Sequence, residues 1–190
     1  MKTIKSCFVV SFFLGLIILF PVSAAAQEPS TGIAGNPLSN GQKMLYERVK
    51  GNILRSAEKM PEDKFGFKPV PEVKSFAQIL GHIADVQSLF CSPVLGEEYQ
   101  ASRIEQTKTH KAELTQALGD AFAYCDRAYD SMTDAQAAQI VKFFGGDQAK
   151  LSVLSFNVSH INEHYGNLVT YMRINGLVPP SSEPRSKPKQ

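Results

Sequence analysis

Two histidines four residues apart, His160 and His164, are the residues whose types and spacing point most directly to chemistry. They lie in the segment Ser159-His160-Ile161-Asn162-Glu163-His164, which is expected to be helical. An α-helix advances about 100° per residue, so the two side chains lie about 40° apart on one face, which we expect to point inward. His82 belongs to the apolar stripe of another expected helix. Three neutral imidazoles can ligate a divalent metal and leave positions open to water or substrate.

Other interpretations of these histidines stay open. Histidines on an apolar face are commonly core residues, and periodicity does not show whether the helix of His82 adjoins that of His160 and His164. Residues 160–164 also match the zinc-protease pattern H-x-x-E-H, with Glu163 as the nominal base. That pattern requires a later helical carboxylate ligand, and only Glu183 follows, close to the C-terminus. The sequence therefore argues against a protease of this type.

A water activated by such a metal needs a proton acceptor, and the candidate catalytic residues are Glu163 and Asp85. Glu163 lies about 80° from the direction of the two histidines, which favours an exposed position. Asp85 follows His82 by three residues and either orients that imidazole or lies in solvent. The catalytic residues are therefore unassigned.

Some further residues have two interpretations, and one is expected to lie outside the site. Asn157 and Asn167 either bond a ligand or satisfy neighbouring helical groups, and the sequon at Asn157 is expected to be accidental because its helix is buried. Tyr171 and the apolar loop Phe143-Phe144 either line a substrate pocket or belong to the core. His110 has polar neighbours and is expected to be exposed.

Four long amphipathic segments must position these residues, because apolar side chains recur in each of them every three or four positions. The expected stripes are Leu45, Val49, Ile53, Ala57 and Met60, ended by Pro61; Ile79, His82, Val86 and Leu89, after a capping box at Ser75 and Gln78; Leu114, Leu118, Ala121, Cys125 and Ala128 within 103–131; and a last helix from an N-cap at Asp147 to Gly176. No segment alternates with period two. The pattern predicts an all-α protein with a four-helix bundle.

The N-terminus resembles a secretory signal peptide: Lys2 and Lys5 precede an apolar run of about 13 residues, and Ala24-Ala25-Ala26 supplies a cleavage site. The run is too short to cross a bilayer, so we expect no stable membrane anchor. The expected organisation is a signal peptide at 1–26, a disordered lead-in at 27–36, the helical domain at 37–180 and a disordered tail at 181–190. The protein is expected to be exported, to the periplasm or the medium.

Charge and cysteine content limit the partners and the compartment. The chain has 20 Lys and Arg against 18 Asp and Glu. Because Lys2 and Lys5 fall in the expected signal, the remaining chain has 18 of each and no net charge, which argues against nucleic-acid binding. Cys91 and Cys125 are either paired in an oxidising compartment or two small buried side chains.

Three segments resemble the DinB-like superfamily, and together they cover most of the chain after the signal. They are Met60-Pro61-Glu62 through Pro69; Ser75 through Ala84, with the sequence SFAQILGHIA; and His160-x-x-x-His164-Tyr165-Gly166-Asn167-Leu168, with Tyr171-Met172-Arg173 and Gly176 to Pro180. The resemblance implies a four-helix bundle with up-down-down-up topology. It also implies a metal triad of His82, His160 and His164 that binds nickel or zinc, and a homodimer as one expected assembly.

Characterised members of that superfamily include thiol S-transferases and a thiol-dependent isomerase, although their cytoplasmic thiols do not suit an exported chain. The expectation is an exported metal-dependent enzyme whose three-histidine site carries out hydrolysis or group transfer on a small molecule. The first alternative is a non-catalytic bundle that binds a metal or ligand in the same place. The second is a bundle in which the histidines are structural.

Overall fold

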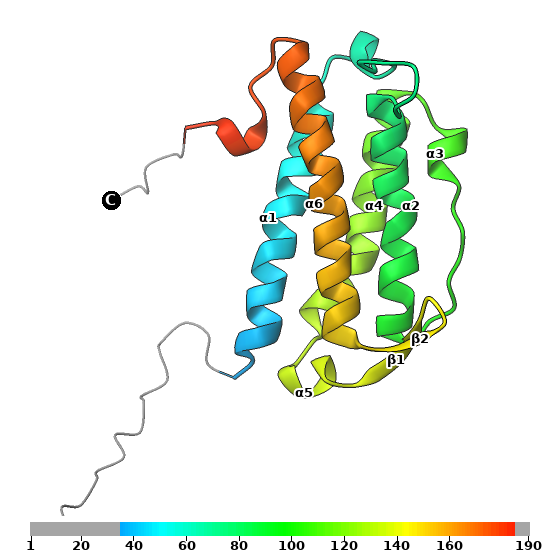
Figure 1. Ribbon diagram of the computed structural model, residues 1–190, viewed down its shortest axis with the longest axis vertical. Helices are drawn as coiled ribbons and strands as arrows, with labels where there is room; N and C mark the ends of the chain where they lie inside the picture. The colour runs from blue at the N-terminus through cyan, green and yellow to red at the C-terminus, as the bar shows by residue number, and fades with distance from the viewer. Residues whose placement is uncertain (1–34, 185–190) are drawn as a thin grey trace, which may run out of the picture.

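The computed structural model describes residues 35–184, which are mostly helical. Four long helices lie side by side (Figure 1): α1 (Pro37–Lys59), α2 (Phe76–Leu95), α4 (Lys111–Asp130) and α6 (Lys150–Ile174). Helices α1 and α6 run in one direction along the long axis, and α2 and α4 run in the other. Helices α1 and α2 each pack against both α4 and α6. The predicted predominance of helix is confirmed.

Shorter elements connect the long helices. They are η1 (Glu62–Lys64), α3 (Ile104–Thr107), α5 (Asp134–Ala137), β1 (Ile140–Phe143), β2 (Gly146–Ala149) and η2 (Pro180–Ser182). The connection from α2 to α4 runs back along the outside of these two helices and carries α3.

The β-hairpin of β1 and β2 corrects the expectation that the chain has no strand. Phe143 pairs with Gly146 in antiparallel register, so Phe144 and Gly145 form a two-residue turn. Both turn residues have positive φ, at 48° and 77°, as a type I′ turn requires. Each strand has only four residues, too few for a period-two pattern to stand out.

The hairpin also changes the start of the last long helix. Asp147, expected as its N-cap, lies in β2 opposite Lys142 and forms an ion pair with it at 2.6 Å. Helix α6 begins three residues later, at Lys150. Asp147 is therefore not the N-cap of α6, because its carboxylate pairs with Lys142 across the hairpin.

The segment expected as one helix at 103–131 is broken into α3 and α4. The backbone N–H of Lys111 donates to the carboxylate of Glu62 at 3.1 Å, and its ammonium group donates to the carbonyl oxygen of Met60 at 2.7 Å. These contacts attach the start of α4 to the chain that follows α1. These tertiary contacts set the start of α4, which cannot be predicted from the spacing of apolar residues in the sequence.

The core lies between the long helices, and most of the predicted apolar stripes are buried. Leu45 is an exception, because it is 49% exposed while its neighbour Tyr46 is buried. The Tyr46 hydroxyl donates to the carboxylate of Asp126 at 2.9 Å, and its ring stacks on that of Tyr129. An aromatic residue with a polar tip thus takes the position expected for a leucine.

Cys91 and Cys125 form a disulfide between α2 and α4, and both are fully buried. Their Cα atoms are 5.4 Å apart, inside the usual range for a disulfide. The alternative of two unpaired cysteines is therefore wrong for this structure. Closing a loop of this separation, 34 residues, stabilises the fold by about 4 kcal/mol in the chain-entropy model.

Both ends of the chain extend beyond the described residues. The expected signal peptide and nearly all of the expected lead-in lie outside them. Part of the expected C-terminal tail is described, and Glu183 there pairs with Arg55 at 2.9 Å and with Lys59. Within residues 35–184, no helix combines the length and apolar character needed to cross a membrane.

Candidate metal centre

The start of α2 is fixed by the capping box that the sequence predicts. Gln78 N–H donates to the Ser75 hydroxyl at 3.2 Å, and Ser75 N–H donates to the Gln78 side-chain oxygen at 2.8 Å. These bonds satisfy amides that the first helical turn leaves free. His82 follows one turn after Gln78, so the cap sets the position from which His82 projects.

Helix α6 supplies His160 and His164, which lie at the border of its buried face. Both are partly exposed, whereas Ile161 and Tyr165 beside them are buried. The imidazoles, expected to point inward, therefore lie half-buried at the edge of the core and not within it. They line the surface between α6 and α2, because the core side of α6 is already filled by apolar residues.

The three predicted histidines converge through their Nε2 atoms. His160 Nε2 lies 3.1 Å from His82 Nε2 and 3.2 Å from His164 Nε2. One ring nitrogen from each residue lies within 4.8 Å of the other two. Ligand nitrogens about 2.0–2.1 Å from a tetrahedral zinc are about 3.4 Å apart. The spacing therefore fits a shared divalent ion.

Burial favours the neutral form of two of these imidazoles, those of His160 and His164. It lowers the pKa of His164 to about 4, with a further contribution from the neighbouring His160. Burial also lowers the pKa of His160, and the nearby His82 adds to the effect. Neutral imidazole is the form that ligates metals, so the lowered pKa values of His160 and His164 suit the binding of a cation.

Glu105 from α3 orients His82. Its carboxylate accepts a hydrogen bond from His82 Nδ1 at 3.2 Å and also pairs with Lys74. A proton held on Nδ1 leaves the Nε2 lone pair directed at the other two histidines. By contrast, Nδ1 of His164 is buried without a hydrogen-bond partner among residues 35–184. His82 is therefore the imidazole whose tautomer a carboxylate fixes.

Asp85 and Gly81 hold α3 where Glu105 can reach. Asp85 accepts hydrogen bonds from the backbone N–H groups of Ile104 at 2.7 Å and Glu105 at 3.0 Å. A Cβ on Gly81 would lie 2.6 Å from the Glu105 Cα atom, so only glycine permits this approach. One interpretation of the sequence was that Asp85 orients His82 directly. In the structure Asp85 instead holds Glu105, and Glu105 contacts His82.

The other candidate residues lie elsewhere. Glu163 and Asn167 are exposed on α6. Asn157 is fully buried, and its amide donates to Gln87 Oε1 at 3.2 Å. Tyr171 donates to the Lys74 carbonyl oxygen at 2.8 Å. These positions favour the surface or structural alternative for each residue.

His110 is exposed, with its side chain 79% accessible, as predicted. It lies 3.6 Å from the Glu62 carboxylate, at the start of α4 and away from the three histidines.

Aromatic rings adjoin His160 on the side of the hairpin. The ring centroid of His160 lies 5.7 Å from that of Phe90 and 6.5 Å from that of Phe156. Phe143 lies 5.4 Å from Phe90, and Phe144 lies 4.2 Å from Phe143. The loop residues Phe143 and Phe144 thus form one cluster with Phe90 and Phe156 beside the site.

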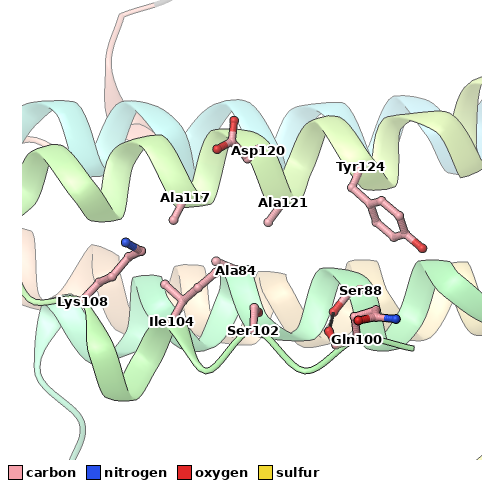
Figure 2. A pocket seen from close by; sticks show the side chains of 10 residues that line it. All are labelled: Ala84, Ser88, Gln100, Ser102, Ile104, Lys108, Ala117, Asp120, Ala121 and Tyr124. Atoms are coloured by element: carbon pink, nitrogen blue, oxygen red, sulfur yellow. Dashed lines mark hydrogen bonds between the residues drawn. The ribbon is translucent and has the colours of Figure 1, made fainter. Parts of the chain in front are cut away.

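A pocket of about 370 Å³ lies between α2, α4 and the connection that carries α3 (Figure 2). Ala84, Ile104, Ala117 and Ala121 project into its middle, with Lys108 at one end. None of the three histidines lines it. The histidines therefore lie on a different side of α2 from this pocket.

Sequence reasoning missed Glu105, Gly81 and Phe156. Glu105 is far from the histidines along the chain, and no local pattern connects it to them. Gly81 did carry a signal, because a glycine inside a helix often marks a close backbone approach. Phe156 lies four residues before His160, on the same helical face.

The fold and the site define a mostly helical protein with three histidines gathered between two helices. The family model described as the DinB superfamily matches residues 45–168. The chain belongs to the DinB superfamily. No curated protein matches it.

Solved structures show the same fold at low sequence identity. A DinB-like protein from Bacillus cereus has a TM-score of 0.65 and 17% identity, covering 74% of this chain and 95% of its own. A DinB-like protein from Bacillus subtilis has a TM-score of 0.62 and 22% identity, covering 77% and 100%. A mycothiol-dependent maleylpyruvate isomerase has a TM-score of 0.58 and 17% identity, covering 68% of this chain and 60% of its own.

Proposed function

We propose that this protein is an exported, metal-dependent member of the DinB superfamily that binds nickel or zinc through His82, His160 and His164. The observation that carries the proposal is the approach of the three Nε2 atoms, with neighbouring pairs 3.1 and 3.2 Å apart. The four long helices support a four-helix bundle of up-down-down-up topology, in which α2 and α6 hold the ligands. A homodimer is the proposed assembly.

The proposed activity is hydrolysis or group transfer on a small molecule. A divalent ion at the histidines would supply Lewis-acid chemistry toward water or a substrate oxygen. The protein's part is to favour the neutral form of His160 and His164 by burial and to orient His82 through Glu105. Their partial exposure leaves this side accessible to a small molecule.

A non-catalytic metal- or ligand-binding protein is the second candidate, and the carboxylates favour it. Asp85 is engaged by backbone amides, and Glu105 by His82 and Lys74. Glu163 points to solvent. General-base catalysis would therefore require Glu163 to turn from solvent toward the histidines, or Glu105 to leave His82 and Lys74, on substrate binding. Turnover of any compound in a panel of esters, amides and thiols would favour the enzyme. Binding of such a compound without turnover would favour the second candidate.

Elemental analysis of protein purified without a histidine tag or chelator tests the metal site. We expect about one equivalent of nickel or zinc per chain. The His160→Ala variant should lose it and keep its helical circular dichroism, because His160 lies between the other two imidazoles. His110→Ala is the matched control, since this exposed histidine is outside the cluster. Unchanged metal content in His160→Ala would contradict the proposal.

A further inference from the structure

The aromatic cluster of Phe90, Phe143, Phe144 and Phe156 lies on the same side of the molecule as the three histidines. Phe156, His160 and His164 follow one another at four-residue spacing on α6. On α2, which runs the opposite way, Phe90 lies about 12 Å along the axis from His82. The surface between these helices is therefore polar at the histidines and aromatic toward the hairpin.

Phe144 is placed against the local preferences of the backbone. It is 69% exposed and occupies the first turn position with a φ of 48°, where type I′ turns favour asparagine. Phe156 is also 47% exposed. A phenylalanine at this turn position does not suit the backbone, and most of its ring stays in water although one side packs on Phe143. This arrangement points to contact with something other than the protein's own interior.

A pocket adjoins the hairpin and gives the cluster a concave side. It has a volume of about 270 Å³, and Phe143, Phe144, Leu89 and Pro93 contribute to its wall. Leu89 and Pro93 lie about 20° on either side of His82 around the axis of α2, so they share its face. Leu89 is about 10 Å from His82 along that axis. One extended molecule can therefore reach from the histidines to this pocket.

The charged residues at the rim of this pocket are already paired. Lys142 forms its ion pair with Asp147 on the hairpin. Glu97 pairs with Arg127 of α4 and accepts a hydrogen bond from the Tyr124 hydroxyl at 3.0 Å. The pocket therefore offers apolar contact without a free charge, which suits an uncharged tail.

We propose that Phe144 and Phe156, the exposed members of this aromatic cluster, bind the apolar tail of a ligand whose polar head lies at the three histidines. The buried rings of Phe90 and Phe143 support them from within. The ligand class is a small amphipathic molecule with a medium-length acyl chain or an aryl group. The inference rests on the proposed function and specifies the substrate class of that same site.

Hydroxamates with short and long tails test the proposal, because they share one metal-binding head. We expect octanohydroxamate to bind the nickel- or zinc-loaded protein at least about tenfold more tightly than acetohydroxamate in calorimetry, since each buried methylene contributes about fourfold. The Phe144→Asn variant should lose most of this difference and bind acetohydroxamate normally. Asparagine suits the turn, so the variant should melt no lower than the original protein.

Ile140→Ser is the matched control, because Ile140 is a 63% exposed apolar residue on the same hairpin outside the cluster. It should leave both affinities unchanged. Equal affinity of the original protein for the two hydroxamates would overturn the tail site while leaving the metal site standing. Failure to take up metal would instead defeat the proposed function.

A second readout uses the metal-free protein and the dye anilinonaphthalenesulfonate. Dye fluorescence should fall in Phe144→Asn and stay constant in Ile140→Ser. Unchanged dye binding in Phe144→Asn, together with a change from dimer to monomer in sedimentation, would overturn the proposal. That result would make the cluster a contact between two copies of the chain.

Discussion

Two polar centres include residues of both α2 and α6, the first also with residues of α4, and they differ in how their groups face one another. The closed centre consists of Gln87, Tyr129, Asn157 and the Cys91–Cys125 disulfide. There, the Asn157 amide donates to Gln87 Oε1 at 3.2 Å and lies 3.3 Å from the Tyr129 hydroxyl, and Tyr129 donates to the Leu154 carbonyl oxygen at 2.9 Å. Donors meet acceptors in these three bonds, and the groups are sealed from solvent, although Asn157 Oδ1 has no hydrogen-bond partner among residues 35–184.

The open centre consists of His82, His160 and His164. Its Nε2 atoms, which act as acceptors when the imidazoles are neutral, face one another at a partly exposed surface. His160 comes only three positions after Asn157 along α6. Paired donors and acceptors therefore stabilise the packing of the helices in the closed centre. In the open centre, three acceptor nitrogens that face one another at the surface favour the binding of a cation.

The largest expected effect comes from opening the closed centre by the double substitution Cys91→Ser and Cys125→Ser. Loss of the disulfide should lower the free energy of unfolding by about 4 kcal/mol, because the unfolded chain is no longer constrained. Urea denaturation with and without reductant measures this. Metal content should stay unchanged at low urea, and its loss in the folded variant would show that the two centres are not independent.

Glu105→Gln should weaken metal binding at the open centre by about 10- to 100-fold. Glutamine keeps the size of the side chain but removes the charge that holds the proton on His82 Nδ1 and pairs with Lys74. Competition with a metallochromic dye measures the affinity. Glu98→Gln is the control, because Glu98 is exposed on the same connection. Equal affinities in the two variants would argue against a positioning role for Glu105.

Asn157→Ala should lower the free energy of unfolding by about 2 kcal/mol, because it leaves buried partners without their hydrogen bond. Asn167→Ala, on an exposed face of α6, should have little effect. Thermal denaturation of both variants gives the comparison. A metal-binding defect in Asn157→Ala at full stability would place Asn157 in the open centre after all.

The smallest expected effect is a pH dependence of the metal-free protein. Between the ordinary histidine pKa of about 6.5 and the pKa of about 4 for His164, the unfolded chain binds a proton that the folded protein does not. The free energy of unfolding should therefore fall as pH falls through this range, by about 1 kcal/mol after solvent screening. His164→Gln should flatten the dependence and His110→Gln should not, as urea titrations at several pH values would reveal.

Periodicity predicted the long helices because helical burial repeats every three or four residues, and the capping box at Ser75 and Gln78 is a purely local signal. The broken segment at 103–131 and the β-hairpin were not predicted. Contacts of Lys111 with Glu62 set one boundary, and a cross-strand pair of Lys142 with Asp147 changed another. Such boundaries depend on residues far away or on strands too short for a pattern.

For the site, the sequence determined which residue types could bind a metal and that His160 and His164 share a helical face. Helix geometry fixes that relation without any partner. Only the tertiary structure decided that His82 meets them, that Glu105 rather than Asp85 contacts His82, and that Asn157 belongs to the closed centre. Those outcomes depend on the rotation of α2 against α6 and on the approach of α3 over Gly81, and packing between elements sets both.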